Sequence, residues 1–168
     1  ATDHTIKLLG RSRAIDDNTA EVMVAPFLLS KEHPLAMVHG VFNAVFVTGN
    51  MLGDSMYYGR GAGKLPTASA VVSDVVDCAR HQGKVIMCFW DKEEVKLADI
   101  GEAERSFFIR AKAGAEDAVT AAFPGGRMVH LKDRKEDFGY FTQSMKEKDF
   151  QAKYEALGGQ MLGRIRLV

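Results

Sequence analysis

The spacing of hydrophobic residues predicts an antiparallel sheet in the first third of the chain. Apolar and polar side chains alternate in residues 21–25, which is the period of a strand with one buried face. Residues 41–47 are apolar almost throughout, as in a strand that is buried on both faces. Further strands are expected over residues 6–9 and 52–58. Pro26 is expected to end or edge the strand before it, because proline cannot donate a hydrogen bond to a neighbouring strand.

The next pattern has the period of a helix that begins at Pro66 or Thr67 and ends near Gly83. Proline is favoured in the first turn of a helix, and glycine commonly ends one. Several apolar residues fall on one face of this helix: Ala68, Val71, Val72, Val75, Val76 and Ala79. Valine has a poor helix propensity, so we expect burial against the sheet to hold this helix.

The last third of the chain alternates between the two periods. Its expected elements, in order, are a strand at 106–112, a helix at 115–123, strands at 127–131 and 138–145, a helix at 146–157 and a strand at 161–168. This order is that of the ferredoxin-like split unit. The whole chain is therefore expected to be α+β, a mostly antiparallel sheet with a covering helix, followed by a ferredoxin-like βαββαβ domain.

Three segments are expected along the chain. Residues 1–83 hold the first sheet and its helix, residues 84–104 are a connector, and residues 105–168 form the second domain. Within the connector, residues 85–90 have the apolar composition of one more strand. Residues 91–104 are charged, as expected between two folded parts.

Composition and charge exclude several classes of function. The 168 residues contain 22 Lys and Arg and 22 Asp and Glu, so net charge favours neither a nucleic-acid partner nor an acidic membrane partner. No apolar run approaches the ~20 residues of a membrane span, and the N-terminus has no signal-peptide pattern. Cys78 and Cys88 are interpreted as buried, reduced thiols, so we expect a cytoplasmic protein.

Three glycines with alternate spacing, Gly59, Gly61 and Gly63, precede the expected helix. Glycine permits positive φ and has no Cβ to keep a ligand from the backbone. The helix N-terminus that follows presents free N–H groups to an anion or a carbonyl oxygen. The spacing does not match a P-loop, because Tyr58 stands where its first glycine should be and Leu65 where its Ser or Thr should be. It does not match the dinucleotide fingerprint either, because Lys64 stands where the third glycine should be. Taken alone, this spacing favours a structural turn between a strand and a helix.

The residues around the loop occur in a specific order. Ile6–Gly10, His33–Ala36, Val41–Val47 and Tyr58–Ala68 together closely resemble homoserine dehydrogenase, in the half of that enzyme that follows its nucleotide-binding domain. The resemblance is strong over residues 5–80. It continues more loosely to the end of the chain, where the family often carries an ACT-type regulatory domain. The resemblance implies that the chain is a C-terminal portion of a larger enzyme.

The resemblance also implies a reaction and a site. The intact protein is expected to interconvert L-homoserine and L-aspartate 4-semialdehyde with NADP or NAD, in threonine, methionine and isoleucine biosynthesis. The glycine loop is expected to lie against the nicotinamide end of the cofactor, with Gly59, Gly61, Gly63 and Thr67 as cofactor-binding residues. The family's catalytic lysine lies upstream of Ala1, so no catalytic residue is assigned here and the chain alone is expected to be inactive. The family's sheet pairs across a two-fold axis, which implies a homodimer.

Other polar residues favour simpler roles. Asn43 interrupts an apolar strand, and we expect it to bond to backbone within the sheet or to reach toward the active site. Arg60 and Lys64 are expected either to contact phosphate or to be solvated. His33 and His39 lack the spacing of a metal site, so no metal is expected.

The expected ACT-type domain would bind an amino-acid effector through the loop after its first strand, at residues 113–117. That loop lacks the Asp-x-Pro-Gly pattern of such domains and carries an acidic pair, so effector binding is expected to be weak. Two alternatives remain open from the residues. One is a non-enzymatic, amino-acid-binding regulatory or assembly module of ACT type, and the other is a complete small nucleotide-binding protein.

Overall fold

The structure, a computed structural model, describes residues 3–84, 87, 89–90, 92–131 and 133–168. Its contacts divide the chain into two compact units. Unit 1 comprises Ala1–Lys31 and Glu94–Val168, and unit 2 comprises Glu32–Glu93. This grouping differs from the three segments expected along the sequence, whose boundaries stay a prediction. The described residues include no helix that is long and apolar enough to cross a membrane.

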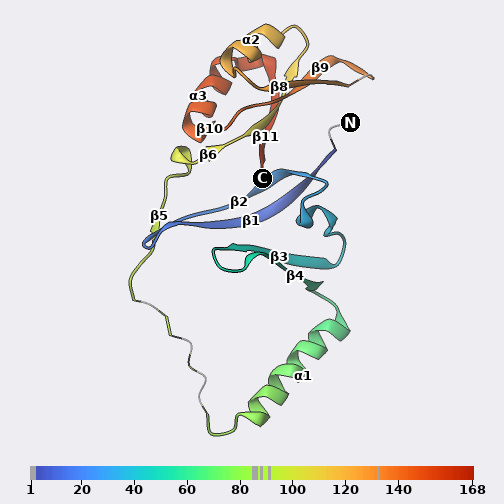
Figure 1. Cartoon of the computed structure of the whole chain (residues 1–168). Helices are drawn as coiled ribbons and strands as arrows, with labels where there is room; N and C mark the ends of the chain where they lie inside the picture. The colour runs from blue at the N-terminus through green and yellow to red at the C-terminus, as the bar shows by residue number, and fades with distance from the viewer. Residues whose placement is uncertain (1–2, 85–86, 88, 91, 132) are drawn as a thin grey trace. The chain divides into compact units, whose positions relative to one another are not determined.

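Unit 1 is built on a seven-stranded sheet, with six strands in the order β1-β2-β11-β7-β9-β8 and β5 paired to β2. The strands are β1 (His4–Asp16), β2 (Thr19–Ser30), β5 (Lys96–Leu97), β7 (Phe107–Lys112), β8 (Arg127–Leu131), β9 (Arg134–Phe141) and β11 (Met161–Leu167). All neighbours are antiparallel except β11 with β2 and β5 with β2. The expected mixed α and β structure with a mostly antiparallel sheet is confirmed (Figure 1).

The β1–β2 hairpin is longer than the sequence pattern predicted. The prediction that a strand ends at Pro26 is wrong, because β2 continues through it and Pro26 pairs with Leu8 of β1. On its other side, β2 pairs with β5 at Thr19 and Ala20 and with β11 only from Phe27 onward. Pro26 therefore stands outside both registers on that side, where a missing N–H removes no ladder hydrogen bond.

The C-terminal elements follow the predicted order closely. After β7 come α2 (Glu116–Ala122), β8, β9, α3 (Glu147–Ala156) and β11, each within one or two residues of its expected bounds except β9, which begins and ends four residues earlier. A short pair, β6 (Glu104–Arg105) with β10 (Met145–Lys146), and the 3-10 turns η2 (Ile100–Glu102) and η3 (Gly158–Gln160) complete unit 1.

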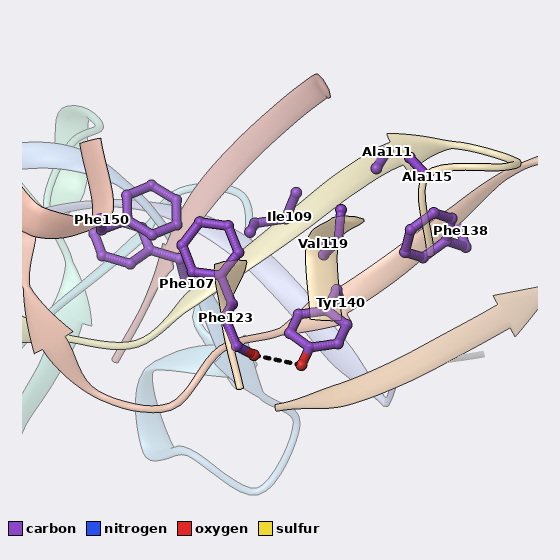
Figure 2. Packing of buried hydrophobic residues seen from close by; sticks show 9 residues of the cluster. All are labelled: Phe107, Ile109, Ala111, Ala115, Val119, Phe123, Phe138, Tyr140 and Phe150. Carbon is purple, nitrogen blue, oxygen red and sulfur yellow. Dashed lines mark hydrogen bonds between the residues drawn. The ribbon is translucent and has the colours of Figure 1, made fainter. Parts of the chain in front are cut away.

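The hydrophobic core of unit 1 lies where α2 and α3 meet β7 and β9 (Figure 2). Phe107 and Phe150 stack with ring centroids 3.6 Å apart, and Phe123 packs beside Phe150. The Tyr140 hydroxyl donates to the carbonyl oxygen of Phe123 at 2.6 Å, the dashed contact in Figure 2. Burying each of these aromatic side chains is worth about 1.5–3 kcal/mol, so this core stabilises unit 1.

Unit 2 consists of η1 (Pro34–Met37), the strands β3 (Phe42–Gly49) and β4 (Gly53–Arg60), and the helix α1 (Lys64–Arg80). The two strands form a separate antiparallel sheet whose register runs from Phe42 opposite Arg60 to Gly49 opposite Gly53. At the start of η1, the His33 Nδ1 atom accepts a hydrogen bond from the Leu35 amide at 3.2 Å.

Burial in unit 2 contradicts the sequence analysis. The β3 strand was expected to be buried on both faces, yet Val45 and Val47 are 62% and 45% exposed. The α1 helix was expected to bury its valines, yet none of its residues is buried. Two strands and one helix offer too little surface to enclose a core of their own.

Two smaller expectations concern the segment after α1. The strand expected at 85–90 lies partly outside the described residues, because 85, 86 and 88 are not among them, and the described residues 87, 89 and 90 form no strand. Cys78 is a free thiol but is exposed, so its expected burial is wrong. Cys88 lies outside the described residues.

Candidate functional site

The candidate site is the glycine loop between β4 and α1. β4 ends at Arg60 and α1 begins at Lys64, so residues 61–63 make the whole connection. Gly63 is the residue before the helix and has φ +118°, a backbone conformation that residues with a side chain rarely adopt. Its carbonyl oxygen accepts the Thr67 amide at 3.1 Å, which is the first hydrogen bond of the helix.

The first turn of α1 is open toward a ligand. The helix begins two residues earlier than Pro66, and no side chain caps its N-terminus. The backbone amides at the start of a helix have no partner within the helix, and Pro66 has no N–H to satisfy. The amides of Lys64 and Leu65, together with the helix dipole, therefore concentrate partial positive charge at the loop.

Gly61 is required for a different reason from Gly63. Its amide donates to the carbonyl oxygen of Val41 at 3.3 Å, which fastens the loop to the start of β3. A Cβ on Gly61 would lie 1.8 Å from Nδ2 of Asn43, so the Asn43 amide fills the space of a side chain at this position. Gly59 pairs with Asn43 in the sheet, and no atom lies within 4 Å of the place where its Cβ would be.

The remaining predicted site residues lie on the same junction. Thr67 is exposed, and its hydroxyl makes no hydrogen bond within the described part of the chain. The Arg60 guanidinium lies over the Phe42 ring, 5.2 Å from its centroid, so this cation has an aromatic partner in unit 2. Lys64 is exposed at the first position of the helix. The structure therefore brings the four predicted residues together, while their cofactor contacts stay a prediction.

Comparison with known proteins identifies the family. A family model described as homoserine dehydrogenase matches residues 1–76, a stretch that includes both strands of unit 2, the glycine loop and most of α1. The chain belongs to the homoserine dehydrogenase family. The homoserine dehydrogenase of Helicobacter pylori is 35% identical over 116 residues, which are 69% of this chain and 27% of that enzyme. That of Synechocystis is 58% identical over 62 residues, which are 37% of this chain and 14% of that enzyme.

A solved structure extends the likeness over the whole chain. The crystal structure of a homoserine dehydrogenase from Thiobacillus denitrificans matches 99% of this chain, with a TM-score of 0.78 and 28% sequence identity. The match covers 43% of that enzyme's chain. The chain spans less than half the length of each of these homoserine dehydrogenases.

The sequence analysis did not predict a network of buried charged residues in unit 1. Glu21 of β2 and Arg105 of β6 form an ion pair, and both side chains are almost fully buried. Glu147 of α3 lies 3.2 Å from Nε of Arg105, and it also accepts hydrogen bonds from Arg166 of β11. Arg13 of β1 pairs with the second oxygen of Glu21 at 3.3 Å. No local pattern in the sequence indicates this network, because its members lie far apart along the chain.

The network also affects a neighbouring arginine. Partial burial lowers the pKa of Arg11, and the positive charge of Arg105 lowers it further, while Glu21 acts in the opposite direction. The network joins the β1–β2 hairpin to the C-terminal elements within unit 1. It therefore has a structural role, at a distance along the chain from the glycine loop.

Proposed function

We propose that this chain is part of a homoserine dehydrogenase that interconverts L-homoserine and L-aspartate 4-semialdehyde with NADP or NAD. Residues 59–67 form the wall of its active site at the nicotinamide end of the cofactor. The observation that carries the proposal is the position of the glycine loop, which lies inside the family-matched residues 1–76 and ends on an uncapped helix N-terminus.

The loop residues fit a flat ring with a carbonyl substituent. The Cα of Gly59 has open space in front of it, so a ring can approach the backbone closely. The free amides of Lys64 and Leu65 can donate to a carbonyl oxygen. The cofactor, when bound, supplies the hydride donor or acceptor. The role of these residues is to hold its reactive ring in one orientation. We assign no proton-transfer residue to this chain.

An assay of the intact enzyme that contains this chain tests the proposal. With L-homoserine and NADP or NAD, nicotinamide absorbance is expected to rise at 340 nm, and other primary and secondary alcohols should give far lower rates. The ratio of rates with NADP and NAD settles which nucleotide the enzyme uses. Absence of homoserine-dependent reduction with either nucleotide would contradict the proposal.

The reaction belongs to the biosynthesis of threonine, methionine and isoleucine, and a cytoplasmic location accords with it.

We further propose that β7, α2, β8, β9, α3 and β11 form an ACT-like regulatory domain. The support is the βαββαβ order with the spatial strand order β11-β7-β9-β8. In the loop where an ACT domain would bind its effector, the backbone amides already have hydrogen-bond acceptors within the chain. The Gly114 amide donates to a carboxylate oxygen of Glu116 at 2.7 Å, and the amides of Ala113 and Ala115 donate to backbone carbonyls. A bound amino acid would have to displace the Glu116 carboxylate, so regulation by pairing of domains is favoured over binding of threonine.

The exposed face of unit 2 supports a homodimer. Val45, Val47 and Tyr57 lie on one face of the β3–β4 sheet and are between 45% and 69% exposed. Apolar side chains gathered on one face of a ribbon with two open edges require cover. We propose a second copy of the chain as that cover.

Light scattering at tens of micromolar checks this prediction. The parent chain is expected to have the mass of a dimer, and Val45→Lys is expected to shift it to the mass of a monomer, because the lysine charge would be desolvated at the interface. Thr48→Lys, on the opposite face and next to Asp54, is the matched control and should stay dimeric. A parent chain that is monomeric at this concentration would contradict the proposal.

A further inference from the structure

The Asn43 side chain occupies the space of the missing side chain at Gly61. Asn43 pairs with Gly59 across the β3–β4 sheet, and its Nδ2 atom lies 1.8 Å from the position of a Cβ on Gly61. Gly59 and Gly61 are two residues apart in an extended segment, so both face the same side as Asn43. Gly61 therefore leaves out a side chain that would overlap the Asn43 amide, whereas the place of a Cβ on Gly59 is open.

The Asn43 amide is available to a ligand. The side chain is exposed, and it makes no hydrogen bond within the residues that the structure describes. A primary amide offers two N–H donors and a carbonyl acceptor. Its neighbours on the same face of β3 are the apolar Val45 and Val47, so Asn43 is the one polar side chain of β3 on that face next to the loop.

We propose that Asn43 is a positioning residue for the nicotinamide carboxamide. This inference rests on the function proposed above and deepens it. The amide of Asn43 and a carboxamide group are complementary, because each has an N–H donor and a carbonyl acceptor that can pair with the other. Such a pair would fix the rotation of the ring against the glycine wall, and with it the face that the ring presents to the substrate. Gly61 keeps the amide in position by leaving it room.

The pairing predicts a specific discrimination between cofactors. In the 3-acetylpyridine analogue of NADP or NAD a methyl group replaces the NH₂ of the carboxamide, so the analogue keeps the carbonyl acceptor and loses the donor. The intact enzyme that contains this chain is expected to bind its nicotinamide nucleotide about tenfold more tightly than the analogue, the ratio that corresponds to one hydrogen bond. Titration calorimetry measures both dissociation constants without turnover.

Two variants and a control locate the source of this ratio. Asn43→Ala removes the amide, and its ratio is expected to fall to about twofold or less. Gly61→Ala keeps the amide but adds a methyl group that displaces it, so it should lower the ratio to a similar extent. The double variant should have the same ratio of dissociation constants as the single variants, because both changes act on one contact. Asn50→Ala, at an exposed turn residue, is the control and should retain the parent's ratio.

The outcomes separate this inference from the proposed function. A lower ratio in Asn43→Ala and Gly61→Ala, with Asn50→Ala unchanged, supports the role of Asn43. An unchanged ratio in Asn43→Ala overturns it, even if the enzyme oxidises homoserine. If the parent binds the nucleotides but does not oxidise homoserine, the proposed function fails while the same ratios still decide the role of Asn43. A parent that binds neither nucleotide overturns both.

Discussion

Replacing Glu21 by alanine is expected to lower the free energy of unfolding of unit 1 by about 3–5 kcal/mol. Glu21 is 2% exposed and pairs with the buried Arg105 and with Arg13. Without it, Glu147 alone remains to offset Arg105 and Arg166. A buried guanidinium that loses its partner retains the full desolvation cost. Urea unfolding followed by near-ultraviolet circular dichroism, which reports on ordered aromatic side chains such as those of the unit 1 core, measures the effect.

An exposed ion pair provides the control for Glu21. Glu102 accepts hydrogen bonds from Lys146 and Lys148, which lower its pKa, but all three side chains are about half exposed. Glu102→Ala should therefore leave the unfolding midpoint almost unchanged at neutral pH. Because the pKa of Glu102 is depressed in the folded state, its small contribution is present above the ordinary pKa of a glutamate and is lost as the pH falls through the folded value. A loss of less than about 1 kcal/mol in Glu21→Ala would show that the network is not a source of stability.

The 168-residue chain alone is expected to have no dehydrogenase activity. Hydride transfer requires the nicotinamide ring and the substrate to be held together, and such positioning is worth effective concentrations of ~10⁵ M or more. The chain contributes one wall, residues 59–67, and contains no dinucleotide fingerprint to hold the rest of the cofactor. Absorbance at 340 nm with homoserine and NADP or NAD should not rise above the buffer blank.

The intact enzyme, assayed at the same molar concentration, is the positive control for this measurement. Reproducible turnover by the purified chain that Gly61→Val abolishes would contradict the prediction. It would mean that the glycine loop belongs to a complete site within these 168 residues.

The C-terminal elements of the fold could be read from the sequence because their signals are local. Apolar residues alternate in β7, and glycines end α3, so the bounds expected for these elements agree with the structure within one or two residues. The β1 strand was underestimated for the opposite reason. Its second half carries Arg11 and Arg13, and the partner of Arg13, Glu21, lies on β2, so no local pattern marks it as a strand.

The candidate site was predictable only in part. The glycine spacing and the helix start were visible in the sequence, and they placed Gly59, Gly61, Gly63 and Thr67 at one junction. The reason for Gly61 was not visible, because the contact with Asn43 depends on the register between β3 and β4. The apolar composition of β3 predicts burial, whereas none of its residues is buried in the structure and one of its two faces is exposed.

A crystal structure of the intact enzyme with its nicotinamide nucleotide tests the central claim most directly. The claim predicts that the nicotinamide ring lies in van der Waals contact, about 3.5–4 Å, with the backbone of Gly59 and Gly61. It also predicts that the carboxamide lies within hydrogen-bond distance of the first amides of α1 or of the Asn43 side chain. A structure in which the nucleotide is bound and its nicotinamide ring lies away from residues 59–67 would contradict the account.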